Sequence, residues 1–325
     1  MKDNLDLILP ECRPGDGQIG QVYAAMANAS RFESAFSSEP LANYAVGGWD
    51  SDPLQELLEF LSPAVTVPER FNYKTAQHAD YFQRLEGDED IRAMGGDFGR
   101  LDTGRQDEVN EQLDEKGLVI VVDAREIEAD PDAEEKAVDR LRRILFRTEI
   151  RRAFGLLDAA ATNEAKVYAT ATDPDQFVSD TLLTAENTSG VRPTNVIYGS
   201  AAWALRQKAY RAQNNAGGYA SAKMTPDELA DFLMVNALAY RESRYRGSSG
   251  LATFLGSKVL MYNAASGVSK DDPSNIKRFV ALTGGQSVMV YRQEFARKVE
   301  ITLAHKSKIK ITSTLGIRKH TVSAS

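Results

Sequence analysis

The feature that most constrains the fold is a long amphipathic helix predicted over residues 131–160. Its apolar positions recur close to the 3.6-residue period of an α-helix, at Val138, Leu141, Ile144, Leu145, Phe146, Ile150, Phe154 and Leu157. Arginines are expected on the other face, at Arg140, Arg142, Arg143, Arg147, Arg151 and Arg152. Asp130 or Asp132 can cap this helix, and Pro131 suits its first turn. At 1.5 Å per residue it would span roughly 45 Å, which indicates a structural spine.

The segments around this helix predict a mixed α/β pattern. Residues 118–122 are the clearest strand, and a helix is expected at Pro53–Leu61. Further strands are expected at Asn195–Tyr198, Lys258–Tyr262 and 287–292, followed by stretches of period two at 299–303 and 308–312.

Two later helices have start signals. Ser200 is expected to cap a helix that runs to about Lys208. Thr225 and Glu228 form a capping box with proline between them, and the helix that they open is expected to carry Leu229, Phe232, Leu233, Val235 and Leu238.

Two segments have little core material of their own. Residues 1–53 are rich in small and polar residues and are expected to form an arm that becomes ordered against another surface. Residues 66–116 are polar, acidic and glycine-rich, and they are too long for an ordinary connection. We expect a projecting flap with legs at 71–82 and 108–114.

Composition and charge narrow the class of protein. No window approaches 18 apolar residues, and the N-terminus lacks a signal peptide's basic and apolar regions, so neither a membrane span nor secretion by that route is expected. The single cysteine, Cys12, cannot form an internal disulfide, which fits a reducing cytoplasm. Residues 1–139 carry a net charge of −19 and residues 140–325 one of +12. Such a polarised chain favours self-association.

Catalytic signals are weak. The three histidines, His78, His305 and His320, form no metal-binding motif, and Ser200 lacks a nucleophile-elbow context. A hydrolase that uses a carboxylate pair stays open as an alternative, since such a pair needs no motif. The basic run at 305–310 indicates either a half-buried strand with one solvated face or a non-specific contact with DNA.

Four stretches, in this order, resemble the major capsid proteins of tailed phages with the Hong Kong 97 fold. They are the proline-bounded entry at 63–68 with the extended leg from Arg70, the flap at 66–116, the strand at 118–122 with its long helix, and residues 188–206. The last stretch is the most specific, because it combines a Gly-Val-Arg-Pro turn, a short strand and a helix.

The resemblance implies an α+β, Hong Kong 97-type capsid fold with five segments. These are an N-terminal arm and short helix at 1–65, an extended E-loop at 66–116, and a P domain with the spine helix at 117–175. An A domain with a central sheet follows at 176–284, and return strands to the P domain with a C-terminal tail occupy 285–325.

The resemblance also implies a function. Copies would assemble into pentamers and hexamers of an icosahedral head shell, in the virion, after assembly in the host cytoplasm. Partners would be neighbouring copies, packaged double-stranded DNA held non-specifically, a portal, and scaffolding or decoration proteins, with no enzyme activity, cofactor, metal or membrane. An encapsulin-like nanocompartment is the alternative.

Candidate contacts between subunits pair acids of the flap with bases of the spine helix. The acids are Glu86, Asp88, Glu89 and Asp90, and the bases are Arg142, Arg143 and Arg147. Some relatives crosslink through a flap lysine, and Lys74 is the only lysine between positions 3 and 115. Since no asparagine partner can be assigned to Lys74, no crosslink is expected.

Overall fold

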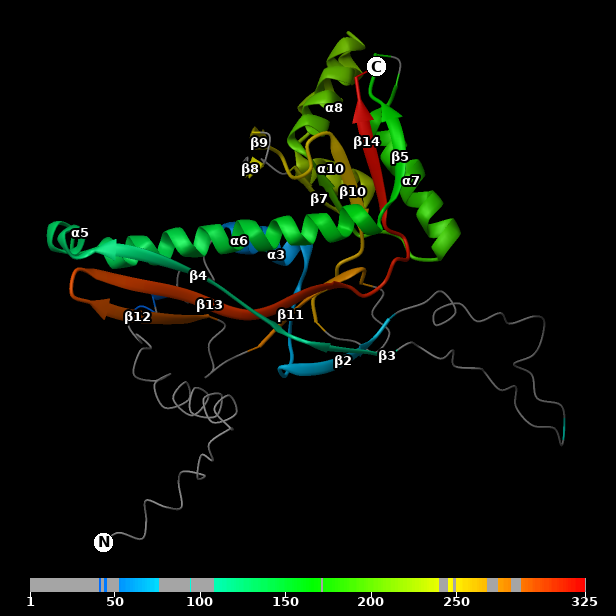
Figure 1. Cartoon of the computed structure of the whole chain (residues 1–325). Coiled ribbons are helices and arrows are strands. Elements are labelled where there is room, and N and C mark those ends of the chain that lie inside the picture. Colours follow the sequence, from blue (N-terminus) through cyan, green and yellow to red (C-terminus); the bar gives the residue numbers. More distant parts are fainter. Residues whose placement is uncertain are drawn as a thin grey trace, which may run out of the picture. The chain divides into compact units, whose positions relative to one another are not determined.

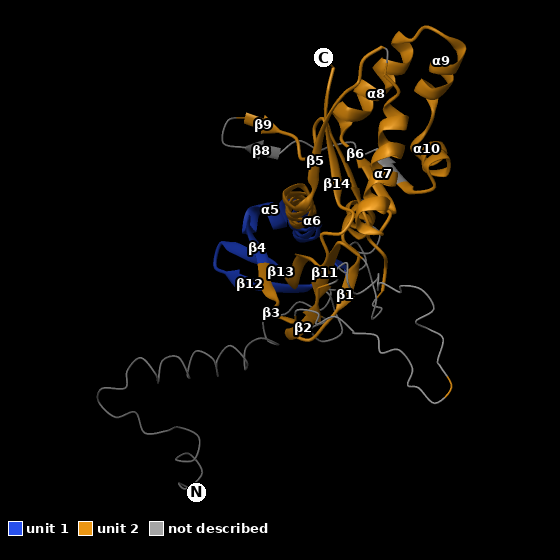
Figure 2. Cartoon of the chain, turned by 90° about the vertical axis from the view of Figure 1, so that its right-hand side faces the viewer, with its two compact units in different colours: residues 1–48, 117–142, 288–304 blue, residues 49–116, 143–287, 305–325 orange. Residues whose placement is uncertain are grey.

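The computed structural model describes residues 41, 44–45, 53–75, 94, 108–170, 172–239, 245–247, 250–267, 274–281 and 288–324. The chain divides into two compact units (Figure 2). Unit 1 comprises residues 1–48, 117–142 and 288–304, and unit 2 comprises residues 49–116, 143–287 and 305–325. Apart from a few residues, the expected arm and the outer part of the expected flap lie outside the described residues.

Unit 2 is built on a five-stranded mixed sheet in the order β5-β14-β10-β6-β7 (Figure 1). The strands are β5 (Thr162–Val167), β14 (Arg318–Ser323), β10 (Lys258–Tyr262), β6 (Asn195–Tyr198) and β7 (Asn236–Ala239). The central pairs β14–β10 and β10–β6 are antiparallel, and the outer pairs β5–β14 and β6–β7 are parallel. The strands expected at Asn195–Tyr198 and Lys258–Tyr262 are confirmed.

Four helices follow or connect these strands: α7 (Pro174–Ser189), α8 (Ser200–Ala212), α9 (Ala216–Lys223) and α10 (Pro226–Leu233). Alternate residues of β6 and β10 face one core with these helices, including Val196, Tyr198, Val259 and Met261. Leu182 of α7 and Leu229 of α10 complete the same fully buried cluster. This core holds the helices on the sheet.

The start of α10 agrees with the sequence prediction, but its end does not. The capping box of α10 is present, with Glu228 N donating to Thr225 Oγ1 at 3.3 Å and Thr225 N donating to Glu228 Oε2 at 2.7 Å. The helix ends at Leu233 because Met234 adopts a left-handed conformation with φ 54°. The expectation that Val235 and Leu238 continue this helix was therefore wrong, and Leu238 lies in β7.

The predicted cap of α8 was also wrong. Ser200 is the first helical residue, Gly199 occupies the cap position without a side-chain bond, and the helix continues to Ala212. A Cβ atom on Gly199 would lie 2.3 Å from the Gly256 carbonyl oxygen. Close backbone approach, rather than capping, therefore requires glycine before this helix.

The remainder of unit 2 includes the base of the flap and the strands next to it. Helix α3 (Pro53–Leu61) is confirmed, and β1 (Ala64–Thr66) follows it and pairs in parallel with β11 (Ile276–Val280). Strands β2 (Arg70–Lys74) and β3 (Glu108–Gln112) form an antiparallel pair. The two expected legs therefore pair at the base of the flap.

Unit 1 contains the end of β4 (Asp114–Asp123), α5 (Ala124–Ala129), the start of α6 (Ala133–Ala160), and β12 (Met289–Phe295) paired with residues 298–304 of β13 (Lys298–Ile311). Elements β4, α6 and β13 each contribute residues to both units. The two period-two stretches near the C-terminus therefore belong to one strand, since β12 pairs with its first half and β11 with its second.

The long helix is confirmed, with a later start than expected. Asp130 accepts a hydrogen bond from Asp132 N, and the helix begins at Ala133, so Pro131 precedes its first turn. Its apolar stripe is buried except at Ile144, whose side chain is 41% exposed. Arg142 is also buried, so the expected arginine face does not include it. Among the described helices, none combines the length and apolarity that crossing a membrane requires.

Candidate functional site

The described part of unit 2 contains two histidines. His305 and His320 are buried, and burial lowers the pKa of each imidazole to about 4. The His320 ring nitrogen Nε2 lies 2.8 Å from Thr181 Oγ1, in the core between α7 and β14. No group of three metal-ligating side chains occurs among the residues that the structure describes, and His78 lies outside them.

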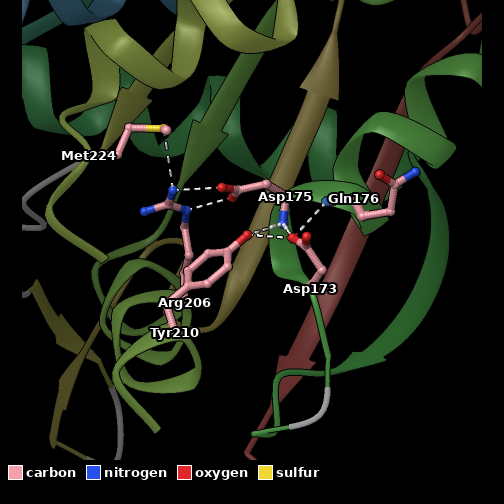
Figure 3. Close-up of polar contacts among 6 residues, drawn as sticks. All are labelled: Asp173, Asp175, Gln176, Arg206, Tyr210 and Met224. Carbon is pink, nitrogen blue, oxygen red and sulfur yellow. Dashed lines mark hydrogen bonds and ion pairs between the residues drawn. The ribbon is translucent and has the colours of Figure 1, made fainter. Parts of the chain in front are cut away.

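The most elaborate polar cluster joins α7 to α8 (Figure 3). Arg206 is fully buried, and its Nε and Nη2 atoms donate to the two carboxylate oxygens of Asp175 at 2.6 and 2.7 Å. The guanidinium also lies over the rings of Trp203 and Tyr210, with distances of 4.8 and 5.2 Å to their centroids. This bidentate geometry and stacking are what a buried arginine needs in order to remain charged.

The second carboxylate of this cluster is engaged as well. Asp173 caps α7 by accepting from the backbone N–H groups of Asp175 and Gln176, both at 3.1 Å, and it also accepts from the Tyr210 hydroxyl. Burial and the bond to Asp173 raise the Tyr210 pKa above its ordinary value. Both carboxylates hold helices in place, so this pair does not have the arrangement of an acid/base couple that faces a substrate.

Sequence reasoning did not single out Asp175 or Arg206. The available signal was Asp173-Pro174, a cap followed by proline at the first helical position, which marks a helix start. Nothing local predicts that an arginine 31 residues farther on meets Asp175 in the core.

The base of the flap is held by an ion-pair network within unit 2. Lys308 Nζ lies 2.8 Å from Glu111 Oε2 and 3.4 Å from Asp114 Oδ1, and Lys310 Nζ lies 2.5 Å from Glu111 Oε1. Hydrogen bonds from Lys308 and Lys310 hold the pKa of Glu111 below its usual value, and the bond to Glu111 raises that of Lys308. Lys306 reaches Glu69 at 3.6 Å.

These contacts bear on the first interpretation of the basic run at 305–310, the half-buried strand. Ser307 and Ile309 are buried, whereas the alternating lysines are half-buried and face carboxylates of β3 and its neighbours. The predicted half-buried strand with one polar face is confirmed, and the contact with DNA stays a prediction. The positive charge of this run is largely neutralised inside the subunit.

Aromatic rings pack on the same face of this strand pair, since Phe71 lies directly opposite Glu111 in the register. The ring centroids of Phe71 and Tyr73 lie 4.5 and 5.3 Å from that of Phe279 on β11. Such distances are typical of favourable aromatic packing. The flap therefore begins from a rigid base with apolar and ionic contacts.

The predicted contact residues differ in their exposure and in their ion pairs. Arg142 is buried and pairs with Asp139 at 3.2 Å, whereas Arg143 and Arg147 are exposed on α6. The four flap acids, Glu86, Asp88, Glu89 and Asp90, lie outside the described residues. Lys74 is exposed at the end of β2, opposite Glu108.

Neither a family model nor a curated protein matches the sequence. Solved structures do share its fold. A phage-related protein from Bordetella bronchiseptica superimposes with a TM-score of 0.66 at 14% identity, covering 89% of this chain and 99% of that chain. A structure from Gordonia phage Cozz gives a TM-score of 0.52 at 9% identity and covers 83% of this chain and 87% of that chain. The chain has the fold of these two proteins. A weaker likeness, with a TM-score of 0.48 at 8% identity, is to the capsid of cyanophage P-SCSP1u, and it covers 82% of this chain and 87% of that chain.

At the level of the fold, the predicted resemblance to Hong Kong 97-type proteins is confirmed. The mixed content of helices and strands agrees with the predicted α+β class.

Proposed function

We propose that this chain is the major capsid protein of a tailed phage, with copies that form pentamers and hexamers of an icosahedral head shell. The observation that carries this proposal is a fold shared along nearly the whole of a protein described as phage-related, and along most of a Gordonia phage protein. The order of the four sequence stretches supports the same assignment.

The proposed role of each segment follows from that assignment. Residues 1–65 would be the N-terminal arm with α3, residues 66–116 the E-loop, and residues 117–175 the P domain with α6 as its spine. Residues 176–284 would be the A domain, and residues 285–325 the return strands with the tail. The paired base β2–β3 and the continuous helix α6 support the second and third of these assignments.

The proposed activity is assembly rather than catalysis. The protein would function in the virion after assembly in the host cytoplasm, enclosing double-stranded DNA without reading its sequence. A portal, and scaffolding or decoration proteins, would be its further partners. The engagement of Asp173 and Asp175 in helix contacts weighs against the alternative of a carboxylate-pair hydrolase.

The proposed subunit contacts start from the flap acids Glu86, Asp88, Glu89 and Asp90 and from the arginines of the spine helix. Arg143 and Arg147 suit such contacts better than Arg142, because their guanidinium groups are exposed. An exposed ion pair contributes only about 0–1 kcal/mol, so a shell would depend on many repeated contacts.

Sedimentation velocity and negative-stain electron microscopy of the full chain at two salt concentrations test the proposal. Closed shells, or free pentamers and hexamers, are expected. A chain that stays monomeric at every concentration, also when co-expressed with the neighbours of its gene, contradicts the proposal. Nuclease-resistant DNA inside particles supports a phage shell, whereas enzyme cargo supports an encapsulin-like one.

A further inference from the structure

The exposed face of α6 in unit 2 carries an unusual ridge. Arg143, Arg147, Arg151 and Gly155 follow one another at intervals of four residues, which places them on one side of the helix. All four are exposed. Arg143 and Arg147 form no ion pair or hydrogen bond with any described residue. We call these four residues the spine ridge.

Gly155 has no evident function inside the subunit. It lies within a 28-residue helix, where glycine is the least favourable residue after proline. A Cβ atom at this position would meet nothing within 4 Å, so packing within the described chain does not require glycine. A groove of about 560 Å³ opens beside it, lined in part by Lys116, Arg152 and Lys310. The open space and the missing side chain would allow another backbone to approach closely.

A complementary surface occurs in unit 1. Residues 123–135 include seven acidic side chains and one basic side chain, Arg125. Five of the acids, Asp123, Glu126, Glu128, Asp132 and Glu135, are exposed, and none of these five forms an ion pair within the part of the chain that is described. We call residues 123–135 the acidic stretch.

We propose that the spine ridge of one copy binds the acidic stretch of a second copy. The contact joins two different surfaces, so it is heterologous, and repeated contacts of this kind close into rings when the rotation permits. Opposite charges favour this orientation over alignment of like surfaces. This inference rests on the proposed assembly function and names the surfaces that perform it.

Charge reversal with rescue tests the pairing in the full-length chain. We expect Arg143→Glu with Arg147→Glu to weaken self-association roughly tenfold in sedimentation velocity, the scale of two exposed ion pairs. Glu126→Lys with Glu128→Lys should weaken it to a similar extent. An equimolar mixture of the two double variants should recover association, because each contact between one variant and the other joins opposite charges, and one chain that carries all four changes should associate like the wild type.

A steric pair of variants tests the role of Gly155. Gly155→Gln should weaken association, because its side chain occupies the space beside the groove. Ala159→Gln places the same side chain one turn away, on an exposed residue outside the groove, and should leave association unchanged. If both variants associate like the wild type, or if both fail to associate, the assignment of Gly155 to the contact is wrong.

Other outcomes would overturn the pairing while leaving assembly intact. If the fourfold variant fails to recover, or if reversal of the flap acids rescues the arginine variant instead, the acidic stretch is not the partner. If the arginine variant assembles normally but loses binding to a random-sequence DNA duplex, the ridge binds nucleic acid. A wild-type chain that never associates would contradict the proposed function itself, which is a distinct result.

Discussion

Replacing Gly155 by alanine should make the isolated subunit more stable. Alanine is more favourable than glycine in a helix interior by about 0.5–1 kcal/mol, because it loses less backbone freedom on folding. Apart from the adjacent residues and the backbone of the helix itself, no atom of the described residues lies within 4 Å of the position that the new methyl group would occupy, so no steric cost from them offsets this gain. The expected result is an increase of about 0.5–1 kcal/mol in the free energy of unfolding.

A second glycine of unit 2 serves as the matched control. A Cβ atom at Gly199 would lie 2.3 Å from the Gly256 carbonyl oxygen and 3.0 Å from Leu255 Cβ, so the backbone has to move. Gly199→Ala should therefore lower the free energy of unfolding by about 1–3 kcal/mol, the usual cost of overpacking. Replacement of glycine by alanine is therefore expected to raise the free energy of unfolding at Gly155 and to lower it at Gly199.

Equilibrium denaturation in urea, followed by tryptophan fluorescence, measures both effects. Dilute protein keeps the chain dissociated, since association would add its own stabilisation. A loss of stability in Gly155→Ala of more than about 0.5 kcal/mol would refute the reasoning, because an added methyl group that fits the open space does not destabilise a helix. Stabilisation by Gly199→Ala would refute it equally.

Three further predictions concern buried and half-buried charges. Arg206→Met should cost about 3–5 kcal/mol in urea unfolding because it leaves the Asp175 carboxylate buried and unpaired, whereas adding Asp175→Leu should recover part of this loss. Lys308→Met should cost about 1 kcal/mol at low salt, and the difference from wild type should shrink at high salt if the pair with Glu111 is responsible. His320 has a folded pKa of about 4 against roughly 6.5 unfolded, so the unfolded chain binds its proton first and stability falls as the pH drops from 6.5 to 4. From pH 7 to pH 5, His320→Gln should lose about 2 kcal/mol less than wild type, and equal losses would contradict the assigned pKa.

Elements with strong local signals could be predicted from the sequence. The capping box of Thr225 and Glu228 defines the start of α10, and a stripe of leucines defines α3. Helix α7 was missed because its sequence has a weak apolar pattern. It depends instead on the Asp173 cap and on Val178 and Leu182 buried against the sheet, and such long-range packing is not visible in a local window.

The candidate contact residues show the limit of reasoning from charge alone. Arg142 and Arg143 are adjacent in sequence and chemically identical, yet one is buried against Asp139 and the other is exposed. Successive residues of an α-helix point 100° apart, so two adjacent arginines can lie on either side of the edge of the buried stripe. Only the arginine outside that stripe is accessible to a partner. The side of α6 that faces the core could be predicted from the sequence, but the edge of its buried stripe could not.

Local density of positive charge is therefore a poor guide to where a partner binds. The lysines at 306, 308 and 310 form a dense basic run, but each already faces a carboxylate of its own subunit. A partner would have to displace those carboxylates, and the exchange of one ion pair for another yields little free energy. Arg143 and Arg147 have no such carboxylate partner among the described residues, so an incoming acid displaces none of them. The exposed charge of Arg143 and Arg147 on a long helix, rather than total charge, is what makes the spine ridge the better docking surface.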